Sequence, residues 1–302
     1  MRSAQGHGNN VHPCAHNTDQ TEALPTFSAL LIGSDAMNAP INASPEPKRS
    51  VVADLERKIS KEMTRLNARF NLFGEGDRIL VGVSGGKDSY TMLHMLRRAQ
   101  QKAPFKFDIV AFHLDQGHPG FPVQRLADYL ESEGYDWIIE REDTYSIVMD
   151  KVPEGKTPCS LCSRLRRGIL YNAARRHGCT KVALGHHRDD LVVTLMLNLF
   201  YSGMMATMPP KLRSDEGDNV VIRPLGYVPE SWIVDLAQAR KFPIIPCTLC
   251  GRGADLKRNR MARLLRDLEA EIPDVKRSLM AAMANVRPSH LLDERVYDHK
   301  NL

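Results

Sequence analysis

The chain has 302 residues, 42% of them hydrophobic and 25% charged, which is ordinary for a soluble globular protein of one large or two modest domains. No stretch approaches the roughly 18 to 20 apolar residues of a membrane span, and the apolar run at 27–33 lacks the cationic flank of a secretory signal. The sequence therefore predicts a cytoplasmic protein rather than a membrane or exported one. The formal net charge of +5 is compatible with a polyanionic partner without establishing one.

The start of the chain differs in composition from the rest. Residues 1–50 are rich in Asn, His, Ser, Ala and Pro without a sustained hydrophobic period, and we expect a disordered tail there. The folded domain is expected at 51–293, followed by a short C-terminal end at 294–302. Its first element is predicted to be an amphipathic helix, because apolar side chains recur in steps of three and four at Leu55, Ile59, Met63, Leu66 and Phe70.

A glycine-rich turn between a predicted strand at 79–83 and a predicted helix is the central feature of the chain. The bare backbone of Gly85 and Gly86 lets successive N–H groups converge on an anion, and the start of the helix adds to the same positive field. Asp88 stands where the Walker pattern requires Ser or Thr, so the turn instead resembles the PP-loop of ATP pyrophosphatases. The expected phosphate contacts are Ser84, Gly85, Gly86, Lys87, Asp88 and Ser89.

Strands and helices alternate through the next part of the chain. Further strands are predicted at 107–116, 136–140, 181–185 and 220–225. Helices are predicted at 123–133, 163–177, 191–200 and 230–241. This alternation predicts a parallel, doubly wound α/β sheet with helices on both faces. Asp115 ends the second strand, where such sheets bind ligands, so it is either a nucleotide contact or a plain turn residue.

Two adjacent carboxylates follow the strand at 181–185, at the same sheet edge as the glycine turn. Asp189 and Asp190 suit a magnesium ion that bridges ATP phosphates, and one of them is also an expected helix N-cap. Together with Lys87 they are the candidate catalytic residues. We interpret His186 and His187 as polar loop residues rather than as acid–base groups.

The chain carries two C-x-x-C pairs, Cys159 with Cys162 and Cys247 with Cys250. Disulfides are not expected in a chain without an export signal, and a redox dithiol needs only one pair. Structural zinc and an iron–sulfur cluster both use such thiolates. The spacing of the cysteines alone does not decide between these two groups.

Basic side chains lie close to both cysteine pairs. Arg164, Arg166 and Arg167 follow the first pair, and a basic helix is expected over 255–268 after the second. We expect both groups to contact nucleic-acid or nucleotide phosphate, and solvated helix faces are the alternative. The predicted core face of the basic helix consists of Leu256, Leu264 and Leu268.

Six segments, in order over 51–293, resemble the tRNA 2-thiocytidine synthetases of the PP-loop ATPase superfamily: SGGKDSYTML, PCSLCSRLRRGILY, GHHRDD, MPPKL, IRPL and FPIIPCTLCG. The resemblance implies an adenine-nucleotide alpha-hydrolase-like fold and ATP-dependent conversion of anticodon-loop cytidine 32 to 2-thiocytidine, with release of AMP and pyrophosphate. It implies Mg²⁺ and a [4Fe-4S] cluster held by Cys159, Cys162 and Cys250. It also implies tRNA as substrate and a cysteine desulfurase as sulfur source.

The implied chemistry agrees with what the residues can do. Oxygen is a poor leaving group at C2 of cytosine, so adenylylation of that oxygen would turn it into part of departing AMP as sulfur attacks. The alternative function is a zinc-stabilised PP-loop RNA-modifying ligase or RNA-binding protein. The reaction of a PP-loop ligase would not itself need four paired cysteines, and a zinc-stabilised RNA-binding protein would not need a nucleotide cradle. The sequence does not determine the oligomeric state, and a homodimer is one option.

Overall fold

The computed structural model describes residues 49–153, 159–214, 219–246 and 256–301. The helices are α1 Arg49–Phe70, α2 Lys87–Lys102, α3 Val123–Ser132, α4 Thr144–Lys151, α5 Cys159–Arg176, α6 Arg188–Tyr201, α7 Glu230–Ala239, α8 Leu256–Glu271 and α9 Val275–Ala282. The strands are β1 Arg78–Gly82, β2 Asp108–Asp115, β3 Trp137–Arg141, β4 Lys181–Ala183, β5 Lys211–Arg213 and β6 Val220–Ile222. The expected tail at 1–50 lies outside the described residues except for 49–50, which begin α1, so that expectation stays a prediction.

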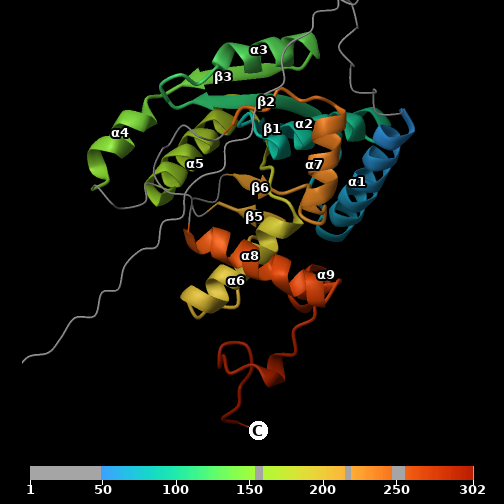
Figure 1. Ribbon diagram of the computed structural model, residues 1–302, viewed down its shortest axis with the longest axis vertical. Helices are drawn as coiled ribbons and strands as arrows, with labels where there is room; N and C mark the ends of the chain where they lie inside the picture. The colour runs from blue at the N-terminus through green and yellow to red at the C-terminus, as the bar shows by residue number, and fades with distance from the viewer. Residues whose placement is uncertain (1–48, 154–158, 215–218, 247–255, 302) are drawn as a thin grey trace, which may run out of the picture. The chain divides into compact units, whose positions relative to one another are not determined.

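The described strands form one sheet in the order β3-β2-β1-β4-β6-β5, and all neighbours are parallel except β5 and β6 (Figure 1). The predicted α/β class is confirmed. Strand β5 is an addition to the predicted strands, because three residues are too few to show an alternating pattern. The chain passes from β1 outward to β3 and then returns to place β4 on the other side of β1. The carboxyl ends of β1 and β4 therefore meet at a topological switch point, where sheets of this kind bind ligands.

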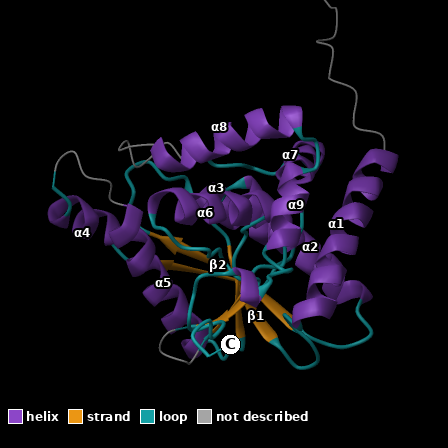
Figure 2. Cartoon of the chain, turned by 90° about the horizontal axis from the view of Figure 1, so that it is seen from below, coloured by secondary structure: helices purple, strands orange, loops and turns teal. Residues whose placement is uncertain are grey.

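Both faces of the sheet are covered by helices. Ile79 and Val81 of β1 pack into the core that contains α1, α2 and α7, whereas Leu80 between them packs toward α5. Figure 2 shows α5 on one side of the strands and α1 and α2 on the other. The predicted amphipathic helix is confirmed as α1, with four of its five expected apolar side chains buried and Phe70 partly buried.

A smaller apolar cluster joins α6 to α8 and α9, which follow the sheet in the chain. Its buried members on α8 are Met261 and Leu265, while Leu264 only packs against it. This corrects the expected core face of the basic helix, whose third member, Leu256, has no described side chain. Short helices α4 and α9 are additions to the predicted elements. Within the described part of the chain, no helix combines the length and apolar composition needed to cross a membrane.

Candidate active site

The glycine turn joins β1 to α2 as predicted, and its conformation depends on both glycine and serine. Gly85 has a φ of +84°, a left-handed conformation that L side chains rarely adopt. The Ser89 hydroxyl donates to the carbonyl oxygen of Gly86 at 2.9 Å and accepts from the N–H of Ser84 at 3.2 Å. These bonds turn the loop back over the start of α2, whose first N–H groups have no intrahelical acceptor. The loop therefore has the geometry of an anion cradle.

Lys87 begins α2 and directs its ammonium group toward two carboxylates. Its Nζ lies 2.9 Å from Oε1 of Glu230 and 3.1 Å from Oδ1 of Asp88. Burial opposes protonation of this amine, but pairing with Glu230 and Asp88 outweighs burial and raises its pKa. Lys87 is therefore a permanent cation at neutral pH. It can exchange these carboxylates for the phosphate oxygens of a nucleotide.

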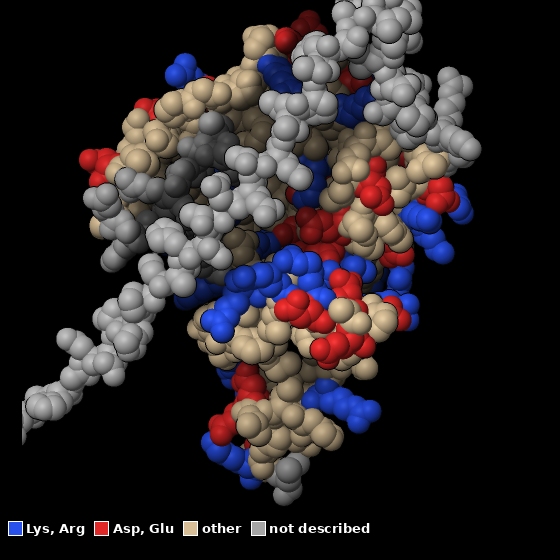
Figure 3. Space-filling model, viewed as in Figure 1, with Lys and Arg blue, Asp and Glu red and all other residues tan. Residues whose placement is uncertain are grey.

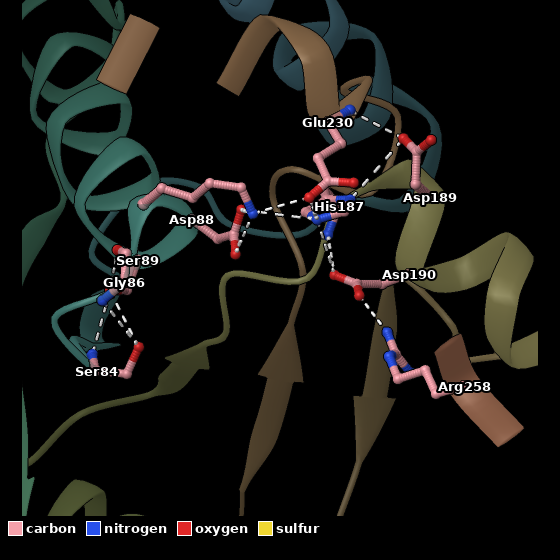
Figure 4. A network of polar contacts seen from close by, with 10 residues as sticks. Ser84, Gly86, Asp88, Ser89, His187, Asp189, Asp190, Glu230 and Arg258 are labelled. Atoms are coloured by element: carbon pink, nitrogen blue, oxygen red, sulfur yellow. Dashed lines mark hydrogen bonds and ion pairs between the residues drawn. The ribbon is translucent and has the colours of Figure 1, made fainter. Parts of the chain in front are cut away.

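His187 lies at the centre of the polar network in Figure 4. Its Nε2 is 3.4 Å from Asp190, 3.6 Å from Asp88 and 3.9 Å from Glu230. It is a loop residue, as expected, but its side chain is buried. The imidazole therefore belongs to a network with Asp88, Asp190 and Glu230, which we call the switch-point network, rather than to the solvated surface.

Asp189 and Asp190 both reach this network, from the first turn of α6. Asp189 accepts the backbone N–H of Glu230 at 2.9 Å and pairs with Nζ of Lys276 at 2.9 Å. Burial raises its pKa, but these donors outweigh burial and the net pKa is lowered. Asp190 pairs with Arg258. Neither aspartate is the N-cap of α6, a position that His187 takes.

The two aspartates of the predicted magnesium site therefore already have cationic partners. Among the described residues, no group of three His, Cys, Asp or Glu side chains is arranged to hold a metal ion. Asp189 has only 11% of its side chain exposed, against 20% for Asp190 and 31% for Asp88. The catalytic and magnesium roles of Asp189 and Asp190 stay predictions, and Asp88 is the most accessible carboxylate of the three.

Asp115 ends β2, one strand away from the glycine turn. One of its oxygens accepts the N–H of Gly117 at 3.0 Å, the turn role that was the alternative to nucleotide contact. The next residue, Gln116, accepts a hydrogen bond from the thiol of Cys162 at 3.3 Å. Cys162 is thus anchored beside the carboxyl end of β2, although its cysteine pair lies far from β2 in the sequence.

Cys162 is the only expected cluster ligand whose side chain the structure describes. The backbone of Cys159 begins α5, and Cys250 lies outside the described residues together with Cys247. The proposed ligand set therefore stays a prediction. A half-buried thiol without a disulfide partner, next to the ligand-binding edge of the sheet, fits the thiolate chemistry that a cluster needs. The three arginines at 164, 166 and 167 are exposed on α5.

Several residues of the site have no signal in the sequence. Glu230 and Lys276 come from α7 and α9 and meet Lys87 and Asp189 only through the fold. Gly185 can be seen in the sequence as a glycine after a predicted strand, but the sequence does not show which part of the chain packs against it. A Cβ at this position would lie 3.1 Å from the carbonyl carbon of Asp88 and 3.2 Å from the nitrogen of Ser89. Gly185 therefore lets the end of β4 approach the start of α2.

Arg223 is another residue of this edge that was not predicted, and it lies directly after β6. Its guanidinium is buried, donating from Nε to Nδ1 of His186 at 3.3 Å and from Nη1 to the carbonyl of Pro209 at 2.6 Å. Burial and the charge of Arg223 lower the pKa of His186 to about 4. The His186 ring is therefore neutral at pH 7 and serves as a hydrogen-bond acceptor.

The fold and the loop together define a nucleotide-binding protein of the PP-loop class, and the family model described as the PP-loop domain matches residues 55–261. The U34-tRNA thiolase NcsA from Methanococcus maripaludis, described with its [4Fe-4S] cluster, shares the fold. Its TM-score is 0.62 at 19% sequence identity, over 84% of this chain and 89% of that one.

Curated relatives of this chain carry the name tRNA-cytidine(32) 2-sulfurtransferase. The protein of Anaeromyxobacter sp. (strain K) is 56% identical over 80% of this chain and 84% of its own length. Those of Delftia acidovorans and Erwinia tasmaniensis are 53% and 54% identical, over 85% and 82% of this chain and 83% and 80% of their own lengths. The chain belongs to the tRNA-cytidine(32) 2-sulfurtransferase family.

Proposed function

We propose that this enzyme uses ATP to replace the C2 oxygen of cytidine 32 in tRNA with sulfur. The observation that carries the proposal is the cradle at the switch point of the sheet, in a chain whose relatives are 2-sulfurtransferases. A cradle and a permanent cation are what a phosphoryl-transfer step requires, because such steps depend chiefly on positioning and charge stabilisation.

In the proposed first step, the C2 oxygen of the base attacks the α-phosphorus of ATP, and the bond from that phosphorus to the bridging oxygen breaks. Pyrophosphate leaves, and the cradle and Lys87 stabilise its negative charge. In the second step, sulfur attacks C2, the bond from C2 to oxygen breaks, and the oxygen departs as part of AMP. The described residues orient the phosphates and supply positive charge in both steps, and none of them has to act as the nucleophile.

The proposed cofactors are Mg²⁺ and a [4Fe-4S] cluster. Mg²⁺ keeps several waters and needs only one or two carboxylates, for which Asp88 and Asp190 are the more accessible candidates. Cys159, Cys162 and Cys250 would hold the cluster, which when bound would carry the sulfur for the second step. The U34-tRNA thiolase NcsA, which shares the fold, is described with its [4Fe-4S] cluster. We further propose a cysteine desulfurase as the sulfur source and the cytoplasm as the site of action.

Pyrophosphate release tests this proposal. The purified, anaerobically reconstituted protein should release pyrophosphate from ATP in the presence of tRNA that carries cytidine at position 32. The same tRNA with uridine at that position is the matched control and should support little release. Equal release with both tRNAs, or release that does not need tRNA, would contradict adenylylation of that base.

A further inference from the structure

A group of large apolar side chains lies exposed where α6 ends. Phe200 and Met205 are 61% and 70% exposed, and the neighbouring apolar residues are also uncovered. We call this group the α6-end surface, and it consists of Leu199, Phe200, Tyr201, Met204 and Met205. An exposed cluster of this kind usually marks an interaction site, because monomeric proteins seldom leave large apolar side chains together in water.

The backbone beneath the α6-end surface is held in one conformation. Asn198 accepts the N–H groups of Ser202 and Met204 on its carbonyl oxygen, each at 3.1 Å. Its side-chain amide donates to the carbonyl of Ala206 at 2.8 Å. Gly203 takes a left-handed φ of +61° that allows the chain to fold back. The surface is therefore preorganised, which reduces the entropy cost of binding a partner.

Positive charge lies next to these side chains. Nζ of Lys257, in the first turn of α8, stands 4.9 Å from the centre of the Tyr201 ring. Arg260 and Arg263 are exposed further along the same helix. Figure 3 shows a blue band of Lys and Arg side chains over α8, which borders an uncharged tan surface. Arg258, adjacent to Lys257, contacts Asp190, so one turn of α8 connects the α6-end surface with the switch-point network.

Two kinds of partner could cover an apolar surface of this type. A second copy of the chain would bring the same surface of both copies together in a two-fold dimer, and the basic side chains of both α8 helices would then repel each other. A single-stranded RNA loop instead offers base faces for the aromatic rings and phosphates for the basic residues. The charge at this site therefore favours RNA over a second protein chain.

The distance along α6 fits an RNA loop. Asp189 and Asp190 lie in the first turn of α6 and Tyr201 is its last residue, so the helix separates them by about 18 Å at 1.5 Å per residue. This is a separation of a few nucleotides along an extended single strand. We propose that the α6-end surface stacks unpaired bases of the tRNA anticodon loop while α8 contacts their phosphates. The proposal rests on the proposed function, because it assumes that tRNA is the substrate.

Binding of an anticodon stem-loop, measured by fluorescence anisotropy at several salt concentrations, tests this inference. Phe200→Ala and Phe200→Leu should each weaken binding about fivefold or more, whereas Phe200→Tyr, which keeps the ring, should bind like the wild type. The salt dependence should not change in these variants, because no charge is lost. Lys257→Ala should instead reduce the slope of log affinity against log salt by about one. Leu292→Ala removes a fully exposed apolar side chain elsewhere and is the matched control.

Three results would overturn the inference. Unchanged affinity of Phe200→Ala and Phe200→Leu would show that the ring does not stack on RNA. Equal loss of affinity for a fully paired RNA duplex would show that unpaired bases are not what the ring recognises. If Phe200→Ala changed the sedimentation coefficient of the protein but left its affinity for RNA unchanged, the surface would be an interface between copies of the chain. Failure of the wild-type protein to bind any tRNA would instead count against the proposed function, which separates the two proposals.

Discussion

The backbone N–H of Ile245 donates a hydrogen bond of 2.9 Å to the carbonyl oxygen of Gly85. This bond attaches the segment after α7 to the glycine turn. Cys247 follows Ile245 by two residues and Cys250 by five, a length of chain that spans at most about 18 Å when fully extended. The second cysteine pair is therefore tied by a short connection to the turn that is expected to bind ATP.

Gly185→Ala should weaken ATP binding without unfolding the protein. The added Cβ would press on the backbone of Asp88 and Ser89 at about 3.1 to 3.2 Å, and backbone cannot move aside as a flexible side chain can. We expect the dissociation constant for ATP, measured by calorimetry, to rise at least tenfold. Gly74→Ala is the matched control, because a Cβ there meets nothing within 4 Å. Equal ATP affinities of the two variants would show that the approach of β4 to α2 does not shape the cradle.

Asp189→Ala should reduce stability as well as activity, in contrast to Lys87→Ala. Loss of this carboxylate leaves Lys276 without its partner on α6 and the N–H of Glu230 without an acceptor. We expect the free energy of unfolding in urea to fall by about 2 to 4 kcal/mol. Lys87→Ala should lose ATP-dependent activity with a change below about 1 kcal/mol, because its side chain is nearer to solvent. Stability losses of equal size would contradict this division of roles.

Glu56 should make the stability of the protein depend on pH. This carboxylate is buried between α1, α2 and α7, and its oxygens lie 2.8 Å from both His94 and Arg98 and also contact Arg240. Burial raises its pKa, but its partners outweigh burial and lower it below the ordinary value of 4.5. The unfolded chain therefore binds the proton more tightly, so this stabilisation is present above pH 4.5 and is lost as pH falls through the lower, folded pKa.

Glu56→Gln should accordingly lower the free energy of unfolding by about 2 to 4 kcal/mol at pH 7 and reduce its loss below pH 4.5. Denaturant unfolding between pH 3 and pH 7 measures both effects. Glu62→Gln, on the same helix and in a more exposed pair with Arg65, should change stability by less than about 1 kcal/mol at every pH. Parallel pH profiles for the wild type and Glu56→Gln would contradict the assigned role of this carboxylate.

The cysteines offer a test of the proposed cluster ligands. Cys159→Ser, Cys162→Ser and Cys250→Ser should each lose iron and activity together, whereas Cys247→Ser should retain most of its iron. Gly251 follows Cys250 and has no side chain that would keep the backbone from a cluster, whereas Pro246, with its fixed φ, would stiffen the approach to Cys247. Iron content and visible absorption of anaerobically reconstituted protein report the result. Retention of iron in Cys250→Ser with loss in Cys247→Ser would reverse the assignment.

The sequence predicted those parts of the site that depend on neighbouring residues. The turn from 84 to 89 is local, so the spacing of Gly85, Gly86 and Ser89 was enough to anticipate its conformation, while phosphate binding there stays a prediction. The partners of its cation were not predictable, because Glu230 reaches Lys87 only after the sheet has formed. Asp189 shows the same limit, since its burial and its bond to Lys276 depend on packing of α9 against α6.

The prediction of helices and strands had a similar limit. For long periodic segments such as α1 and β2, the predicted bounds lie close to the observed bounds. Strand β5 and helices α4 and α9 were not predicted, because three to eight residues carry too little periodicity to be distinguished from loops. The core face of α8 was assigned incorrectly, since α6 and α9 determine which side of the helix they cover.

The fate of the oxygen atom that sulfur replaces tests the proposed adenylylation of cytidine 32. A tRNA carrying ¹⁸O at C2 of cytidine 32 is incubated with ATP, a sulfur source and the anaerobically reconstituted protein, and mass spectrometry is applied to the tRNA and the released AMP. We expect 2-thiocytidine at position 32 and AMP that is heavier by one ¹⁸O atom, with neither product formed by Lys87→Ala. Thiolated tRNA accompanied by unlabelled AMP, or thiolation at wild-type levels by Lys87→Ala, would contradict activation of the base by adenylylation in this cradle.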